Sequence, residues 1–395
     1  MKQIVKNNLR PLYYFTLYFI GCIIRLFTKV HKNRILCWSY YGKKYSCNPR
    51  YITEYLLEHN PNESEIYWAF MDKHKLSLPP QIKAVSYNSL KYLYLLNTSE
   101  YVITNARTEI KTFRVWKKRK GQKYIMTWHS SMGIKAIEKD VADKLGPFYV
   151  SAAKTDSEYC DLIFSGCKFR SNVIRRAFWY DNEILEKGTP RNDMLFDKSK
   201  YNVLKEKIFT TYSIPNDAKI LLYAPTFRKD HKLHYYKLNW DRIVNVLDNK
   251  FNNNFYILLR LHPNMIGDCE DVSTLLNYQK VIDVTLYEDM QELLTVSDIL
   301  ITDYSSSTFD MALTYKPCFI YATDYSTYDR GTYLALDSLP FPFAQSENEL
   351  IDLLKNFDSS VYEKTLKVFM AETLGSFENG HACEEFYKWM KNHQM

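Results

Sequence analysis

Short apolar runs separated by polar, turn-forming segments recur along most of the chain. In the first half these runs predict strands at residues 34–39, 65–70, 82–85, 101–104 and 123–128, with helices at 49–58 and 89–97. Each predicted strand is nearly continuously apolar, which is typical of strands that are buried on both faces of a parallel sheet. The alternation of such strands with helices predicts βαβ units.

The pattern restarts after a turn-rich, charged region between about residues 186 and 218. Strands are predicted at 219–224, 255–261, 298–302 and 318–321, and helices at 241–249, 288–295, 306–314, 347–356, 361–372 and 383–392. A chain of 395 residues is too long for one ordinary core, so we expect two Rossmann-like domains, 33–185 and 186–395, after a separate segment 1–32. Two such α/β domains facing each other across a cleft are the GT-B architecture.

The N-terminal segment carries an apolar run at residues 12–24, with Lys6 and Arg10 before it and Arg25 and Lys29 after it. The run is too short to span a bilayer comfortably, which takes about 20 residues, and no small-residue cleavage site follows it. We therefore expect a membrane-associating helix that lies in the interface, with its basic flanks near anionic headgroups. A spanning anchor and a helix packed on the protein's own surface are the alternatives.

Composition narrows the function only slightly. Hydrophobic content of 46% and charged content of 25% are ordinary for a globular protein, and the net charge of +7 favours an anionic partner such as a nucleotide, a phosphate polymer or a membrane surface. The eight cysteines lack metal-ligand spacing, and neither a dinucleotide fingerprint nor a P-loop occurs. We expect reduced thiols, no metal site and no cofactor.

Two histidines each follow a predicted strand: His129 after residues 123–128, and His262 at the end of the run 255–261. In open α/β sheets, ligands bind just beyond the carboxyl ends of the strands. The two positions therefore predict an active site in a cleft between two facing sheets. A histidine with its ordinary pKa near 6.5 is suited to act as a general base there.

A second chemical signal follows the predicted strand 298–302. Asp303 comes first, and then Ser305, Ser306, Ser307 and Thr308 lie at the start of a predicted helix. The first backbone N–H groups of a helix are unpaired and favour anions, so this turn is predicted to hold a diphosphate. The competing interpretation is an ordinary capped helix start.

Eight segments resemble, in order, motifs of the CDP-glycerol glycerophosphotransferase family, which includes teichoic acid primases, polymerases and their ribitol-phosphate and capsule relatives. The segments are residues 50–57, 104–107, 127–130 with Lys135 and Asp140 beyond, 189–193, 223–228, 259–263, 303–310 and 329–333. The resemblance covers about residues 34–385. Each motif alone is weak, but eight in order are highly specific.

The resemblance implies a CDP-glycerol or CDP-ribitol donor, a lipid-linked teichoic acid or capsular polymer as acceptor, release of CMP, and no nucleic-acid partner. It implies a peripheral enzyme on the cytoplasmic face of the membrane. His129 matches the family's proposed base, and His262 is expected to be the second catalytic residue. The residues expected to bind the donor are Arg228, Ser305, Ser306, Ser307, Thr308, Asp310 and Arg330, and those expected to bind the acceptor are Asn105, Arg107, Lys135 and Asp140.

One motif departs from the family pattern: the expected WHGTP reads Trp128-His-Ser-Ser-Met132. The loop after His129 should therefore differ from that of the family. The sequence does not choose between glycerol and ribitol, or between a primase and a polymerase. A nucleotide-sugar glycosyltransferase of the same fold and a non-catalytic family member remain the alternatives.

Overall fold

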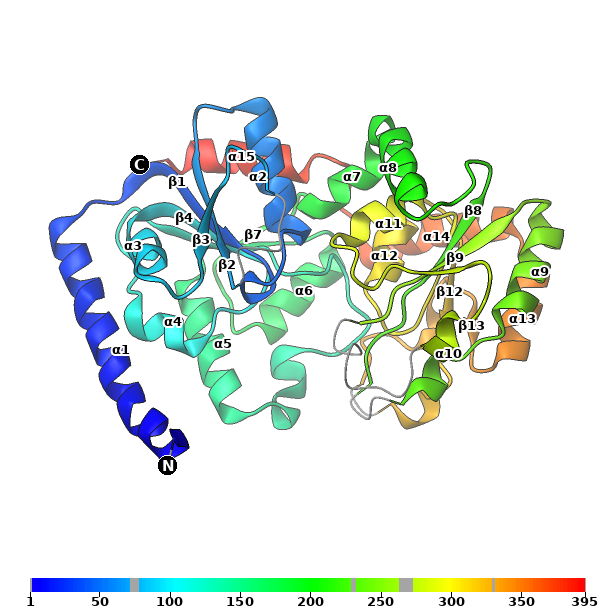
Figure 1. Ribbon diagram of the computed structural model, residues 1–395, viewed down its shortest axis with the longest axis horizontal. Coiled ribbons are helices and arrows are strands. Elements are labelled where there is room, and N and C mark those ends of the chain that lie inside the picture. Colours follow the sequence, from blue (N-terminus) through cyan, green and yellow to red (C-terminus); the bar gives the residue numbers. More distant parts are fainter. Residues whose placement is uncertain (1, 72–77, 229–231, 263–272, 329–330, 395) are drawn as a thin grey trace.

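Two parallel sheets form the framework of the computed structural model, one in each of two lobes (Figure 1). The structure describes residues 2–71, 78–228, 232–262, 273–328 and 331–394, with side chains from residue 14 onward. All strand pairs in both sheets are parallel. This confirms the α/β fold expected from the sequence, and its GT-B-like arrangement is supported by the structural comparison below.

The first lobe holds a sheet of strand order β3-β2-β1-β4-β5-β6-β7. Its strands are β1 (His31–Trp38), β2 (Glu65–Phe70), β3 (Lys83–Ser86), β4 (Ser99–Thr104), β5 (Lys123–Met126), β6 (Leu162–Phe164) and β7 (Glu183–Leu185). Its helices are α1 (Lys2–Phe27), α2 (Cys47–His59), α3 (Leu90–Thr98), α4 (Ile110–Val115), α5 (Pro147–Tyr159) and α6 (Lys168–Ala177). Cys37 packs in one apolar cluster with Ile52 of α2, and Leu36 packs in another with Leu95 of α3. Burial on both faces explains the continuous apolar runs.

The second lobe holds a sheet of strand order β10-β9-β8-β11-β12-β13. Its strands are β8 (Lys219–Tyr223), β9 (Phe255–Leu259), β10 (Val281–Asp283), β11 (Ile299–Thr302), β12 (Cys318–Tyr321) and β13 (Phe343–Ala344). The helices of this half are α7 (Asp193–Phe196), α8 (Lys198–Thr211), α9 (Trp240–Phe251), α10 (Ser273–Leu276), α11 (Met290–Val296), α12 (Ser307–Ala312), α13 (Glu347–Lys355), α14 (Ser359–Val368) and α15 (Ala382–Asn392). A π-helical turn, Phe369–Leu374, continues α14.

Every strand predicted from the sequence is present; β2 and β12 have the predicted bounds, and the ends of the others differ by at most three residues. Helices α4–α8 and α10 and the short strands β6, β7, β10 and β13 were not predicted. The sequence of α8, for example, is charged and buries only Leu204, Ile208 and Phe209. β5 and β9 end before the histidines that follow them, so His129 and His262 both lie in loops beyond the carboxyl ends of their strands.

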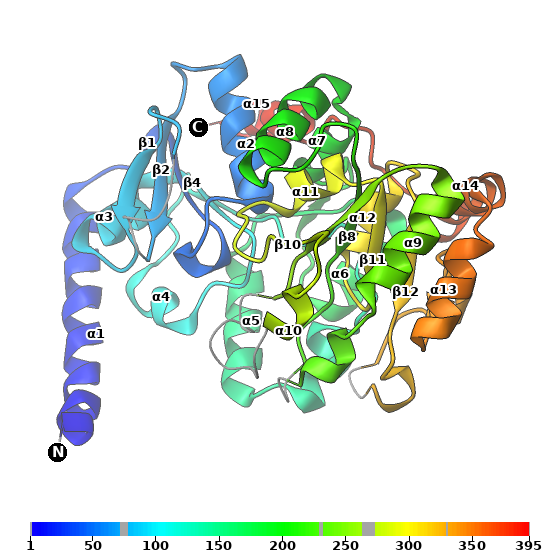
Figure 2. The ribbon, with the colours of Figure 1, turned by 45° about the vertical axis from the view of Figure 1, so that its right-hand side comes forward.

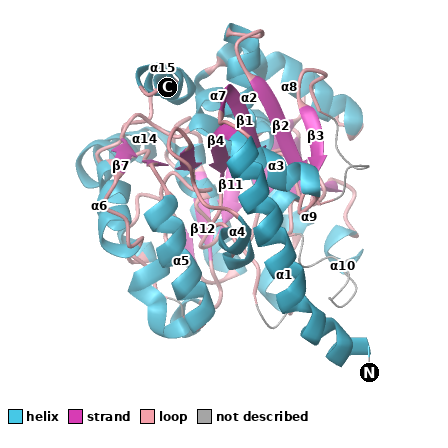
Figure 3. Ribbon diagram, turned by 90° about the vertical axis from the view of Figure 1, so that its left-hand side faces the viewer, coloured by secondary structure: helices cyan, strands magenta, loops and turns pink. Residues whose placement is uncertain are grey.

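Helix α1 extends well beyond the apolar run that suggested it and lies against α3 and α4 (Figures 2 and 3). Gly21 permits the close approach, because a Cβ there would lie 2.8 Å from the carbonyl oxygen of Val115. Arg25 fixes the end of the helix by donating to the side chain of Asn97 at 2.9 Å. Among the described helices, none combines the length and apolar character needed to cross a bilayer.

The last helix returns to the first lobe, where α15 lies beside α2 (Figure 1). The hydroxyl of Tyr101 in β4 donates to the carbonyl of Met390, and the indole of Trp389 donates to Glu183 in β7. Asp193 accepts from two backbone N–H groups at the start of α15, at 2.9 and 2.8 Å. The chain therefore crosses between the lobes twice, before α7 and again before α15.

Candidate active site

His129 lies in the loop after β5, next to Trp128, which adopts a left-handed backbone conformation with φ of 55°. Its imidazole stacks on the indole of Trp128 with ring centres 4.7 Å apart. The Nδ1 atom lies 3.1 Å from the carbonyl oxygen of Asn105. A carbonyl can only accept, so Nδ1 carries the proton and Nε2 carries the lone pair of the neutral ring. This is the tautomer that a general base requires.

Two of the expected acceptor residues lie inside the first lobe. The Asn105 side chain is buried and accepts from the backbone N–H of Tyr40 at 2.8 Å. The Arg107 guanidinium is buried between Glu138 and Asp156, at 3.0 Å from each. The structure therefore places Arg107 in an internal ion-pair network, whereas Asn105 orients His129 through its backbone carbonyl.

The other two expected acceptor residues lie where the first lobe meets the second. The backbone N–H of Ala136 donates to Gly331, and that of Tyr333 donates to Ile134. Between them, the Lys135 ammonium lies 5.9 Å from the ring centre of Tyr304. Asp140 is paired at the surface with Arg176, at 2.8 Å. Lys135 is thus brought to the second sheet, and Asp140 is held farther out.

His262 lies in the loop after β9, with its ring centre 5.6 Å from that of Phe227. Loss of hydration, followed by the charges of Lys135 and Lys44, lowers the pKa of His262 below its ordinary value. The ring is therefore neutral near pH 7 and carries one N–H group. An anion bound beside it would raise that pKa again.

Sequence reasoning missed two further cations near His262. Burial, followed by the charge of Arg260, lowers the pKa of Lys44 to about 8. The Nη1 atom of Arg260 is buried and has no hydrogen-bond partner among the described residues. Glu288 and Asp289 also act on Lys44, but together with Lys43 and Lys135 the cations near His262 outnumber these two carboxylates, which favours an anionic ligand. Arg260 lies inside a recognised motif and could have been found from it, but no sequence signal placed Lys44 here.

The predicted diphosphate turn is partly used for internal hydrogen bonds. The Ser305 hydroxyl accepts from the backbone N–H of Ser307 at 3.2 Å and from its hydroxyl at 2.8 Å. Thr308 donates to the carbonyl of Ser305 at 3.1 Å and is buried. Ser305 and Ser306 are only half-buried, so they are the accessible members of the turn.

Arg228, expected to bind the donor, is held between two carboxylates. Its guanidinium lies 2.9 Å from Asp303 and 2.6 Å from Asp324, and it also covers the ring of Tyr304. Both carboxylates balance its charge, so Arg228 orders the loops around Tyr304. Arg330, the remaining expected donor residue, lies outside the described residues.

Asp310 lies at the junction between the lobes, and its side chain is buried. Its carboxylate pairs with the guanidinium of Arg191. It also accepts from Ser131 at 2.6 Å, from Gln291 at 3.0 Å and from Asn192 at 3.2 Å. The carboxylate is therefore surrounded by donors from the loop after β5, from the crossing segment and from α11.

Arg191 is a third residue that sequence reasoning missed, although it lies in a recognised motif. Besides pairing with Asp310, its guanidinium donates to the carbonyl oxygen of His129 at 2.7 Å. Its backbone N–H donates to Asn48 at 3.0 Å. Arg191 thus positions the backbone of the candidate base from the junction between the lobes.

A cavity of about 620 Å³ also lies between the lobes, beside α2 and α11. Its lining includes Glu54, Glu288, Asp289 and Glu292 but only two cations, one of which is Arg50. This excess of carboxylates disfavours a diphosphate, so the cations near His262 are the better candidate. Within the described part of the chain, no group of histidine, cysteine and carboxylate side chains suits a metal ion.

Comparison with known proteins identifies the family of the chain. The family model for CDP-glycerol:poly(glycerophosphate) glycerophosphotransferase matches residues 20–390. A teichoic acid poly(glycerol phosphate) polymerase of Staphylococcus epidermidis is 32% identical over 370 residues, which are 90% of this chain and 50% of that protein. A teichoic acid glycerol-phosphate transferase of Staphylococcus aureus is 29% identical, covering 97% of this chain and 100% of that protein.

The solved structure of the wall teichoic acid polymerase TagF superposes with a TM-score of 0.81 at 29% identity, covering 99% of this chain and 98% of that chain. The chain spans about half the length of the curated poly(glycerol phosphate) polymerases from S. epidermidis and Bacillus subtilis. The match over residues 20–390 nevertheless covers most of the chain. The chain belongs to the CDP-glycerol:poly(glycerophosphate) glycerophosphotransferase family.

Proposed function

We propose that this chain transfers glycerol phosphate from CDP-glycerol to a hydroxyl of a membrane-linked teichoic acid acceptor and releases CMP. The observation that carries the proposal is the orientation of His129 by the backbone carbonyl of Asn105, in a chain that belongs to this family. The cations Lys44, Arg260 and Lys135 near His262 support it. Related proteins that share this fold and family are named as teichoic acid polymerases and transferases, and a variant of TagF was soaked with CDPG.

In the proposed step, the acceptor hydroxyl oxygen attacks the β-phosphorus of the donor. Its proton passes to Nε2 of His129, and the bond between the β-phosphorus and the bridging oxygen breaks. The electron pair of that bond stays on the CMP that leaves. General-base catalysis of this kind contributes about 10²–10⁴-fold to a rate.

The donor diphosphate is placed at Ser305 and Ser306, with the neutral His262 donating an N–H and Arg260 supplying positive charge. These hydrogen-bond donors and this cation would stabilise the negative charge that develops on the leaving CMP. Donors that are already held in position contribute most where charge develops in the transition state. Arg228 contributes by holding Asp303 and Asp324 in place.

We place the enzyme on the cytoplasmic side of the membrane, held by α1 without spanning. The support is a row of exposed apolar side chains on this helix: Phe15, Phe19, Ile23, Leu26 and Phe27. Basic residues at both ends of the segment would face anionic headgroups.

The test is CMP release from CDP-glycerol and, in parallel, from CDP-ribitol, with a lipid-linked glycerol phosphate acceptor. His129→Gln should lower the rate at least 10²-fold, the magnitude of a lost general base. His59→Gln is the matched control, because His59 is an exposed histidine at the end of α2. A folded His129→Gln protein with wild-type activity refutes the assignment, and preference for CDP-ribitol refutes the glycerol donor.

A further inference from the structure

Three arginines among the described residues have a buried side-chain nitrogen without a hydrogen-bond partner: Arg170, Arg191 and Arg260. Arg191 and Arg260 belong to the candidate active site. Arg170 lies in the first turn of α6, inside the first lobe, and the proposed reaction does not yet use it. Buried polar groups are nearly always paired, so an unpaired buried cation needs a physical explanation.

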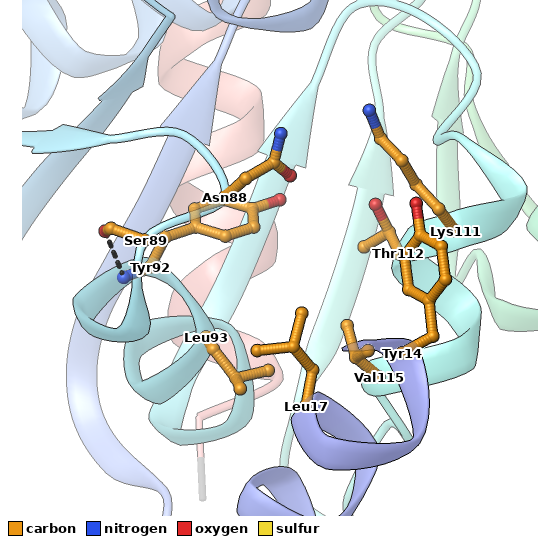
Figure 4. Close-up of a pocket in the computed structure, with 9 residues that line it drawn as sticks. All are labelled: Tyr14, Leu17, Asn88, Ser89, Tyr92, Leu93, Lys111, Thr112 and Val115. Atoms are coloured by element: carbon orange, nitrogen blue, oxygen red, sulfur yellow. Dashed lines mark hydrogen bonds between the residues drawn. The ribbon is translucent and has the colours of Figure 1, made fainter. Parts of the chain in front are cut away.

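The polar groups of the small cavity between α1, α3 and α4 differ from Arg170 (Figure 4). The side chains of Tyr87 and Thr112 lie near the hydroxyl of Tyr92, which is uncharged. The cation that lines this cavity, Lys111, is already held in an ion pair at 2.8 Å. Neither group leaves a charge unbalanced there, so Arg170 is the more informative exception.

Aromatic rings surround the guanidinium of Arg170. The side chain is 2% exposed, and its guanidinium carbon lies 4.9 Å from the ring centre of Phe178 and 5.7 Å from that of Trp128. These two rings also contact each other edge to face, with centres 4.7 Å apart. The faces of aromatic rings attract a cation, but they do not accept all of its hydrogen bonds.

This position is unfavourable for a cation in three ways. Burial lowers the pKa of Arg170 to about 10, so the guanidinium still carries its charge near pH 7 at the expense of its hydration. The first turn of a helix is the positive end of the helix dipole, which disfavours a cation. The charge of Glu138 acts on Arg170, but Glu138 forms its ion pair with Arg107, at 3.0 Å. The stability of the fold therefore does not explain why a cation lies here.

Trp128 connects Arg170 to the candidate base. Its backbone is left-handed, with φ of 55°, which is uncommon for a bulky residue. Its indole stacks on the imidazole of His129, with ring centres 4.7 Å apart. Asn105 fixes one ring nitrogen of His129 and Arg191 fixes its backbone carbonyl, whereas the plane of the imidazole rests on the indole.

We propose that Arg170 is a positioning residue for the transfer reaction. Its charge holds the indole of Trp128 against the imidazole of His129, so that Nε2 keeps the direction in which it receives the proton of the acceptor hydroxyl. Arg170 acts through these two rings and does not touch the reacting atoms. The inference rests on the proposed role of His129 as the base.

The first experiment measures kcat and KM for CMP release together with thermal melting. Arg170→Met should lower kcat about 10-fold, because small displacements of a catalytic group cost up to about 10²-fold in rate. The KM for CDP-glycerol should stay at the wild-type value, and the melting temperature should not fall, because an unpaired buried charge has been removed. Arg170→Lys keeps the charge and should recover most of the loss. Arg175→Met, at an exposed arginine of the same helix, is the matched control and should leave kcat unchanged.

The second experiment tests whether Arg170 acts through His129. Residues that act as a unit have non-additive effects, so in the His129→Gln background Arg170→Met should lower kcat no further. A 10-fold loss that persists in this background overturns the proposal. So does a lower melting temperature of Arg170→Met with unchanged kcat of the folded protein, which is the result expected of a purely structural residue.

A third measurement needs no substrate and separates this inference from the proposed function. In NMR spectra of histidine-labelled protein, the His129 signal is identified by its absence in His129→Gln, and the indole ring current displaces it. Arg170→Met should move this signal and Arg175→Met should not; an unmoved signal overturns the inference, whereas wild-type activity of His129→Gln overturns the proposed base. If Arg170→Met does not fold, Arg170→Gln is measured in the same way. Failure of both variants to fold shows a structural role and also overturns the inference.

Discussion

Asp310 was expected to bind the donor, but its buried carboxylate is surrounded by protein donors at the junction between the lobes. The informative perturbation is Asp310→Asn, which keeps the shape and removes the negative charge. Arg191 would then be a buried cation without its partner, since its own side chain is only 7% exposed. We expect a loss of stability as the main effect.

Removing one partner of a buried ion pair costs about 3–5 kcal/mol. Unfolding entropy is about 2.1 cal/mol/K per residue, which for 395 residues gives about 0.8 kcal/mol/K. The melting temperature should therefore fall by about 4–6 °C. Arg176→Gln is the matched control, because its pair with Asp140 is at the surface and such pairs contribute about 1 kcal/mol or less.

The assay combines thermal melting with a double-mutant cycle of Asp310→Asn and Arg191→Met. Contacting residues in one network should show a coupling energy of about 0.5–3 kcal/mol. The KM for CDP-glycerol should stay close to the wild-type value although the melting temperature falls. An unchanged melting temperature together with a raised KM would show that the carboxylate serves the donor, and would refute the structural role.

Three further predictions follow from charge and exposure. Burial raises the pKa of Glu378 to about 8, so the stabilisation from its proton is complete below about pH 4.5 and is lost as the pH rises through 8. Glu378→Gln should flatten the dependence of the unfolding free energy on pH, measured by denaturant titrations from pH 5 to 9. An unchanged dependence in the variant would contradict this prediction. CDP-glycerol should raise the lowered pKa of Lys44, so that binding at pH 8 takes up about half a proton. The uptake is measured by calorimetry in buffers of different ionisation enthalpy, and Lys44→Gln should abolish most of it. The double variant Phe15→Glu with Phe19→Glu should reduce flotation of the protein with anionic vesicles at least 10-fold. The control Val203→Glu changes an exposed apolar position on α8 and should leave flotation unchanged. Equal flotation of the double variant and the control would exclude α1 as the anchor.

Nine of the strands were predicted because they are nearly continuously apolar, whereas β6, β7, β10 and β13, of two or three residues each, are too short to give a pattern. β2 and β12 have the predicted bounds, since every residue of β12 and nearly every residue of β2 is buried. Helix α8 escaped prediction because three buried side chains in a charged segment give a weak pattern. Helix α1 fills most of the expected segment 1–32 and exceeds the apolar run 12–24, because only part of the helix is apolar.

The site could be predicted only in part, for a different reason. Motifs locate residues along the chain, but they do not say which way a side chain points. Arg107 and Asp310 lie in recognised segments, and yet both face the interior and pair there. Lys44 and Arg260 come together across the two lobes, and neither the pattern nor the spacing of the sequence encodes that meeting.

The two crossings between the lobes limit how the halves can move. They lie side by side, because the backbone N–H of Thr189 in the first crossing donates to the carboxylate of Glu378 in the second at 3.0 Å. Two adjacent tethers suppress twisting and leave bending about a single line through them as the soft degree of freedom. Contacts near that line, such as Asn192 with Glu378, would hardly lengthen, whereas those of the loop around Lys135 with residues 331–333 would separate first. The separation between the lobes would therefore be largest on the Lys135 side, and cutting the chain between α14 and α15 would release the twisting motion as well.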